Sequence, residues 1–289
     1  MRSHRITMCL FGIIFSGLSI FAQTPSPSPS PTPQSLPTPT LEREFFKNIV
    51  EDQKAIWTSP FHLHRGDSRW AAPLGLGAVA LMVTDRSTGD EIAESNKQLN
   101  ASRIVSYAGS TFGTSGVAAT FYLIGRATHD ERARETGLLG AEALIDSGIV
   151  VTALKEITQR ARPTAGSERS EFFERGSSFP SGHSIEAWSL ATVIANEYHD
   201  RPVVEVAAYA AASAVSIARF TGRNHYLSDV LVGSAMGFGI GRYVYHTHHR
   251  AISRPGGDEE SRTAKRWPAI APEYNRRARE YGMSLAWSF

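Results

Sequence analysis

The sequence has little cysteine, almost no excess of either charge and no sustained strand-like alternation over residues 41–250. Its one cysteine, Cys9, lies near the amino terminus. A disulfide within the chain is therefore excluded, and so are a cysteine metal site and a thiolate nucleophile in the body. The 30 basic and 28 acidic side chains leave a net charge of +2. Nucleic acid is not expected as a partner, because binding to a phosphate backbone requires a clear basic surplus.

The amino-terminal 40 residues predict an export signal followed by a spacer. Residues 1–22 combine Arg2 and Arg5 with a short uncharged apolar run, which favours a cleaved signal peptide over an uncleaved anchor. Residues 23–40 alternate proline with serine or threonine, a pattern typical of an extended linker. We therefore expect an exported protein of the periplasm or cell envelope.

Residues 41–250 predict an all-α domain, a bundle of about six helices. The expected helices span 71–84, 103–126, 137–159, 184–198, 203–219 and 226–246, with loops at 85–97 and 163–178. Acidic residues interrupt several apolar segments, which favours a buried soluble core over membrane spans and leaves both open. Residues 251–289 form a tail whose last nine residues have the period of a β-strand, expected to pack on the helices.

The first polar cluster contains Lys155 and Arg162, followed by Pro163. The two cations are seven residues apart, so both are expected on one helix face, and the proline should end the helix at Arg162. Cations at the end of a helix also complement its dipole. Alone, the cluster favours that structural role.

The second cluster is Pro180-Ser181-Gly182-His183, directly before an apolar helix. Amides in the first turn of a helix can bind an anion, Gly182 allows close approach, and His183 supplies a transferable proton. An ordinary helix cap explains the same residues equally well.

The third cluster joins Arg219 at the end of one helix to His225 and Asp229 at the start of the next. The spacing of His225 and Asp229 places them on one helix face, where the carboxylate accepts the Nδ1 proton and leaves Nε2 with a lone pair. A local hydrogen bond without catalytic purpose is the alternative.

Together, the clusters supply three permanent cations, free amides and two histidines, a set that suits a tetrahedral oxyanion. In this order they resemble the motifs of the type-2 phosphatidic acid phosphatase family, whose superfamily includes bacterial acid phosphatases and vanadium haloperoxidases. The motifs occupy residues 155–229, and the likeness of the helical body extends over about 71–246. One departure is Ala218, where the family usually has serine; the missing hydrogen bond is worth about 1 kcal/mol.

The resemblance implies a metal-independent phosphatase with a phosphohistidine intermediate. His225 would attack phosphorus, Asp229 would orient it, and His183 would act as general acid and base. Five residues would bind the phosphate: Lys155, Arg162, Ser181, Gly182 and Arg219. The implied substrate is a lipid phosphate, an isoprenyl diphosphate or a small phosphomonoester, and a membrane surface is a further candidate partner. No cofactor is implied, and vanadate would enter only as a phosphate mimic.

Two other functions stay open: a vanadate-dependent haloperoxidase, and a non-catalytic envelope protein. The remaining histidine groups are expected in surface roles: His62 and His64, and His246, His248 and His249. The second group has the residue type for a metal site, but a solvated helix end is the simpler expectation. Arg160 is expected at most at the rim of the phosphate pocket.

Overall fold

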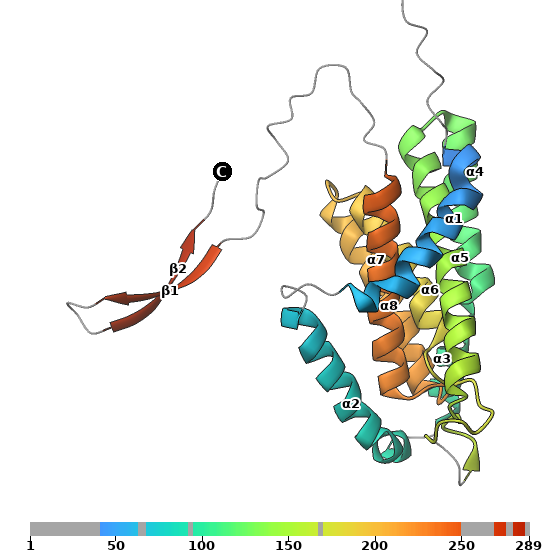
Figure 1. The fold of residues 1–289 in the computed structure, drawn as a ribbon, viewed down its shortest axis with the longest axis vertical. Coiled ribbons are helices and arrows are strands. Elements are labelled where there is room, and N and C mark those ends of the chain that lie inside the picture. Colours follow the sequence, from blue (N-terminus) through green and yellow to red (C-terminus); the bar gives the residue numbers. More distant parts are fainter. Residues whose placement is uncertain are drawn as a thin grey trace, which may run out of the picture. The chain divides into compact units, whose positions relative to one another are not determined.

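The structure, a computed structural model, describes residues 41–62, 68–91, 95–166, 170–249, 269–275 and 280–286 (Figure 1). The predicted signal peptide, the linker, His64 and most of the tail lie outside these residues. The helices are α1 (Leu41–Thr58), α2 (Ser68–Glu91), α3 (Asn96–Ala108), α4 (Thr111–Thr128), α5 (Glu131–Thr158), α6 (Gly182–Glu197), α7 (Pro202–Thr221) and α8 (Leu227–His248), with a 3₁₀ turn, η1, at Ser59–Phe61. The prediction of an all-α body is confirmed for these segments.

The described residues form eight α-helices where the sequence predicts about six, and two of the differences have local reasons. The expected helix over 103–126 is two helices, α3 and α4, because Ser110 caps α4 by accepting a hydrogen bond from the Gly113 amide at 3.3 Å. The expected loop from Asp85 is instead the end of α2, which continues to Glu91. Asp85 is buried there at 1% exposure, so it belongs to the interior and not to a surface loop.

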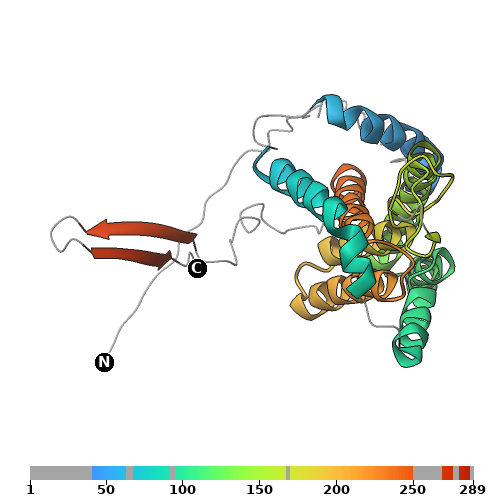
Figure 2. The ribbon, with the colours of Figure 1, turned by 90° about the horizontal axis from the view of Figure 1, so that it is seen from below.

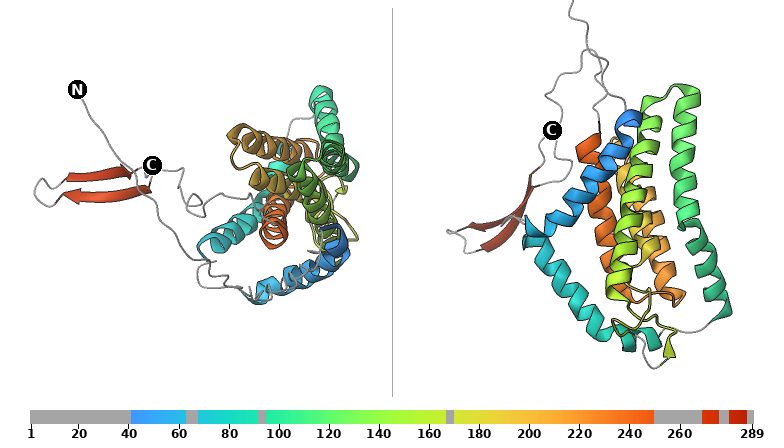
Figure 3. Two further views of the ribbon diagram at one scale, coloured as in Figure 1. Left: turned by 90° about the horizontal axis from the view of Figure 1, so that it is seen from above. Right: turned by 45° about the vertical axis from the view of Figure 1, so that its right-hand side comes forward.

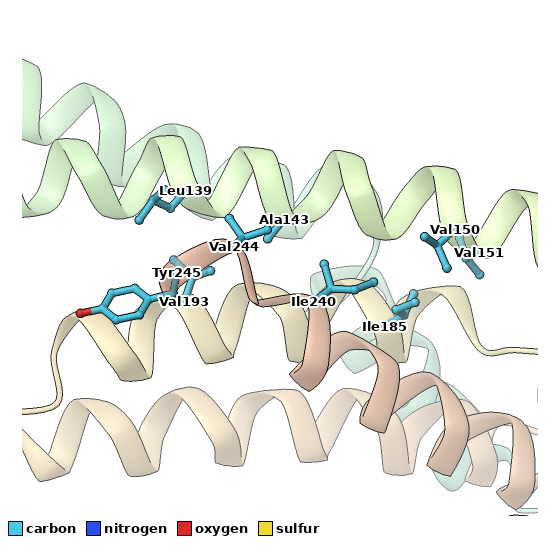
Figure 4. Packing of buried hydrophobic residues seen from close by; sticks show 9 residues of the cluster. All are labelled: Leu139, Ala143, Val150, Val151, Ile185, Val193, Ile240, Val244 and Tyr245. Carbon is cyan, nitrogen blue, oxygen red and sulfur yellow. The ribbon is translucent and has the colours of Figure 1, made fainter. Parts of the chain in front are cut away.

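Helix α6 is the centre of the bundle and packs against α4, α5, α7 and α8. Figure 2 looks at the bundle from one end, and the right panel of Figure 3 shows α1 crossing obliquely over α5 and α8. The main apolar cluster joins α5, α6 and α8 and includes Leu139, Val150, Ile185, Val193 and Val244, all at most 1% exposed (Figure 4). Burial of these side chains fixes the three helices that carry most of the motif residues.

The contact between α6 and α8 depends on glycine. Gly233, Gly237 and Gly241 lie four residues apart, so they form one stripe along α8. A Cβ atom at Gly233 would lie 2.7 Å from the Ser181 carbonyl oxygen, and Cβ atoms at the other two would overlap carbonyl oxygens of α6. The helices therefore touch backbone to backbone, which brings the start of α6 against the start of α8.

Helices α5 and α7 are long and apolar enough to cross a membrane by length and composition. The apolar window of α5 is 56% buried, whereas that of α7 is 28% buried. Helix α5 thus resembles a buried core helix, whereas most of the apolar surface of α7 is exposed.

Within the tail, β1 (Ala269–Asn275) and β2 (Glu280–Ala286) pair antiparallel, with Ala269 opposite Ala286. The expected packing of this segment on the helices stays a prediction.

Candidate active site

The second motif begins α6, as the sequence predicts. Ser181 is the N-cap, and its amide donates to the carbonyl oxygen of Asp229 at 3.1 Å. Gly182 and His183 are the first two residues of the helix, so their amides have no acceptor within it. A Cβ atom at Gly182 would lie 3.4 Å from Nζ of Lys155. The first and second motifs therefore meet at the amino-terminal end of α6.

The first motif is arranged differently from the prediction. Helix α5 ends at Thr158, and Gln159 turns the chain with a left-handed φ of 45°. The expectation that Lys155 and Arg162 share a helix face is wrong, because Arg162 lies in the loop beyond the helix. Its guanidinium donates to Ser177 Oγ at 3.3 Å.

The third motif also departs from the predicted helix face. His225 precedes α8, whose N-cap is Tyr226, so the histidine and Asp229 are not both helical. Nδ1 of His225 lies 2.7 Å from the backbone oxygen of Ser178 and 3.6 Å from Oδ2 of Asp229. A carbonyl oxygen only accepts, so Nδ1 carries the proton and Nε2 keeps its lone pair. The tautomer is therefore the predicted one, but the Nδ1 proton is donated to the carbonyl oxygen of Ser178 and not to Asp229.

Asp229 lies beyond hydrogen-bond distance of His225, and other donors bond to its oxygens. Oδ1 accepts from Nη1 of Arg160 at 2.6 Å. Oδ2 accepts from Ser178 Oγ at 2.5 Å and from the Tyr226 amide at 3.0 Å. The carboxylate is completely buried. It is therefore a fixed negative charge beside the imidazole.

Arg160 is not at the pocket rim, where the sequence placed it, but in the interior at 0% exposure. Its guanidinium bridges Asp229 to Asp85, whose Oδ2 accepts from Nη2 at 2.8 Å. It also lies over the rings of Phe172 and Tyr226, with the guanidinium carbon 4.9 and 4.6 Å from their centroids. Sequence reasoning missed Arg160 and Asp85 because their pairing joins residues 75 positions apart.

Positive charge dominates the electrostatics around His183. Burial lowers the pKa of His183 to about 4, with further lowering by Arg219, His225, Lys155 and Arg162. Burial and the charge of Arg162 likewise lower the pKa of Arg219 to about 10. The three cations of the first and third motifs therefore lie near one another and near His183.

The two members of the third motif are held in the forms that catalysis by a nucleophilic imidazole would need. Burial lowers the pKa of His225, and Asp229 only partly opposes the shift. Burial alone would raise the pKa of Asp229, but His225 and Arg160 outweigh it and lower the pKa. At neutral pH the pair is thus a neutral imidazole beside a carboxylate. Arg219 is 8% exposed, and its Nε has no hydrogen-bond partner among the described residues, which leaves a donor for an anion.

The structure therefore brings the residues of the three motifs together. Such a set of donors around a neutral imidazole suits a phosphoryl group. Residues 136–253, which include all three motifs, match the family model of the PAP2 superfamily.

The chain is also similar to individual proteins. A lipid A 1-phosphatase of Porphyromonas gingivalis is 37% identical over 89 residues, which are 30% of this chain and 20% of that protein. The chain thus spans about a fifth of the length of that relative. Two solved structures were also found. Aquifex aeolicus LpxE has 19% identity and a TM-score of 0.42 over 53% of this chain and 88% of that one. A transmembrane PAP2 type phosphatidylglycerolphosphate phosphatase from Bacillus subtilis has 20% identity and a TM-score of 0.43 over 71% and 94%.

Proposed function

We propose that this protein is an exported phosphatase that hydrolyses the phosphate monoester of a lipid through a phosphohistidine on His225. The observation that carries the proposal is the bond from Nδ1 of His225 to the Ser178 carbonyl at 2.7 Å. It leaves the Nε2 lone pair available in a pocket with three cations, where a dianionic substrate is attracted and the nucleophile stays neutral.

In the proposed reaction, Nε2 of His225 forms a bond to phosphorus while the bond from phosphorus to the leaving oxygen breaks. Lys155, Arg162 and Arg219 stabilise the charge on the phosphoryl oxygens, with Ser181 and the Gly182 amide as further donors. His183 gives its proton to the leaving oxygen and then takes one from the water that cleaves the phosphohistidine. The negative charge of the substrate favours the protonated form of His183, which burial and the surrounding cations disfavour.

The donor set needs no metal ion for this chemistry. Its one carboxylate, Asp229, is already bonded to Arg160 and Ser178. A two-metal phosphatase would instead need several carboxylates open to the pocket. The cations and amides of the site perform the charge neutralisation that metal ions would otherwise provide.

A lipid substrate is supported by an apolar groove between α1, α4 and α5, with a volume of about 530 Å³. Its wall includes Phe45, Tyr122, Leu144 and Ile145, and Glu186 of α6 lies at its edge. The charge of Glu186 acts on Lys155, so the groove lies close to the phosphate site. The volume is in the range that binds ligands with substantial apolar parts. The lipid A 1-phosphatase relative is named for a lipid phosphate as well.

Exposed apolar side chains on α2, α3, α4 and α7 support reaction at a membrane surface. The most exposed are Val83, Tyr107, Phe112 and Val203, between 74% and 85%. Large apolar surface of this kind marks an interaction site.

The decisive experiment follows the phosphoenzyme. Purified protein is mixed with a radiolabelled lipid phosphate and quenched in alkali, where phosphohistidine survives and acyl phosphate does not. Wild type should yield label on His225, and His225→Ala should yield none and lose turnover while it still binds inorganic phosphate. His183→Ala should accumulate label with a substrate that has a good leaving group.

His62→Ala is the matched control, because the ring of this exposed histidine bonds only to the backbone oxygen of Thr58 among the described residues. It should retain wild-type turnover. Hydrolysis at a near-normal rate by His225→Ala would disprove the nucleophile.

A further inference from the structure

A second cluster of ionisable residues lies in the interior, away from the phosphate site. It combines Asp52 of α1 with Glu142 and Asp146 of α5 and His248 of α8. The three acidic residues are at most 1% exposed, and the His248 side chain is 10% exposed. The sequence predicted a solvated helix end for this histidine. That prediction is wrong, because α1 covers the end of α8.

The polar atoms of the cluster have the spacing of ligands around one cation. Nε2 of His248 lies 2.8 Å from Oδ1 of Asp52 and 3.6 Å from Oε1 of Glu142. The donor atoms of these three residues all lie within 4.8 Å of one another. Ligands bound at about 2.0–2.2 Å to one metal ion are themselves roughly 3–3.5 Å apart.

An independent observation is that two carboxylate oxygens in this cluster have no donor. Oε1 of Glu142 and Oδ2 of Asp146 are buried without a hydrogen-bond partner among the described residues. The other oxygen of Asp146 is held by Gln53 Nε2 at 2.8 Å, and Oε1 of Glu142 faces His248. A buried carboxylate oxygen without a donor is unfavourable, and a cation between these groups would satisfy it.

The cluster also has more acidic than basic groups, which likewise favours a bound cation. Three carboxyl groups face one imidazole, and within the described part of the chain His248 is the one ion-pair partner of Asp52 and Glu142. A neighbouring cluster is different: His249 lies 3.2 Å from both Glu135 and Glu197, and Arg132 lies 3.9 Å from Glu197. There a guanidinium, which also pairs with Asp200, joins the imidazole beside the two carboxylates. Within the described residues, the first cluster has no such second positive charge.

We propose that Asp52, Glu142 and His248, with Asp146 beside them, bind a divalent transition-metal cation such as Zn²⁺ or Mn²⁺. The mixture of carboxylate oxygens with one imidazole nitrogen suits these ions better than Mg²⁺ or Ca²⁺, which prefer oxygen alone. The ion ties α1 to α5 and α8. Its site is separate from the phosphate site, because Asp146 precedes Lys155 by nine residues, about 13 Å along α5.

The test measures metal binding by the full chain in detergent, after a chelator has been applied and removed. Zn²⁺ or Mn²⁺ is added, and bound metal is counted by mass spectrometry after desalting. We expect about one ion per chain and a higher thermal unfolding midpoint. Asp52→Asn and His248→Gln should each weaken binding by more than about tenfold, since even residues that only support a metal ligand have effects of 10–100-fold. Glu135→Gln, in the neighbouring cluster, should bind like wild type.

Co²⁺ added to the wild-type chain gives a test that needs no variant, because coordination by protein ligands produces visible absorption bands that free Co²⁺ lacks. Displacement of these bands by one equivalent of Zn²⁺ would support the site. The proposal is overturned if wild type shows no saturable binding, if both cluster variants bind as wild type does, or if Glu135→Gln alone loses the ion. Loss of the ion does not bear on the phosphohistidine, which is measured separately on His225.

Discussion

At the scale of single residues, the protonation state of His225 is the property on which the proposed chemistry depends. Its pKa lies below the ordinary value of 6.5 because the ring is 2% exposed, and Arg219 and Arg162 add to the effect. A lower pKa means that the imidazole remains neutral, and therefore nucleophilic, at pH values where an exposed histidine would be protonated.

We expect the acidic limb of kcat/KM, which reports the free enzyme, to have an apparent pKa below 6.5. The measurement is a pH series with p-nitrophenyl phosphate. Asp229→Asn removes the negative charge that opposes the shift, so the limb should move to still lower pH as the rate falls. An acidic limb at or above 6.5 would contradict a buried, neutral His225.

Arg160 acts at the same scale as a positioning residue, because it contacts Asp229 and not the phosphate site itself. Lysine in its place keeps the charge but loses the planar fork that bridges Asp85 and Asp229. Arg160→Lys should lower kcat about 10–100-fold, the usual effect of a displacement of about 1 Å, and leave KM for p-nitrophenyl phosphate nearly unchanged.

The matched control is Arg86→Lys, whose ion pair with Glu171 is half exposed. Its kcat should equal that of wild type. A folded Arg160→Lys protein with normal kcat would show that Asp229 needs no such support.

At the scale of helices, the glycine stripe on α8 allows close contact with α6, and this contact positions the residues of the site. Gly237→Ala places a methyl group against the carbonyl oxygen of Ile185, so the two helices must separate. We expect a loss of about 1–3 kcal/mol in the free energy of unfolding. Denaturant unfolding followed by circular dichroism measures it.

Gly239→Ala provides the comparison on the same helix, since no atom lies within 4 Å of its Cβ position. There alanine should stabilise the protein by about 0.5–1 kcal/mol, because it favours the helix more than glycine does. Equal effects of the two substitutions would refute backbone contact between α6 and α8.

At the scale of the whole molecule, the groove between α1, α4 and α5 distinguishes a lipid phosphatase from one that acts on small esters. Gly148 lines this groove, and nothing lies within 4 Å of its Cβ position. Gly148→Leu should fold, because leucine is favoured over glycine in a helix, and should fill the space meant for an acyl chain. KM for a long-chain lipid phosphate should rise at least about tenfold, the effect of roughly 1.4 kcal/mol.

The same variant should hydrolyse p-nitrophenyl phosphate normally, and Gly239→Leu, outside the groove, should leave both substrates unaffected. If Gly148→Leu changed neither substrate, the acyl chain would have to bind elsewhere.

The sequence by itself determined the helical body, the chemical inventory of the three motifs and the family resemblance that follows from them. Those properties depend on periodicity and on residue types close together in the chain, which the local order of amino acids expresses directly. The start of α6 at Gly182 was predicted within two residues for this reason.

Only the tertiary structure decided which side chains complete the site. Arg160 meets Asp85 across 75 positions, and His248 meets Asp52 across 196. Neither pairing has a local signature, because burial of a charged side chain depends on distant segments that supply its counter-charge. The same reason explains the break after α5: Gln159 turns the chain so that Arg160 points inward, although the helical pattern alone continues to Pro163.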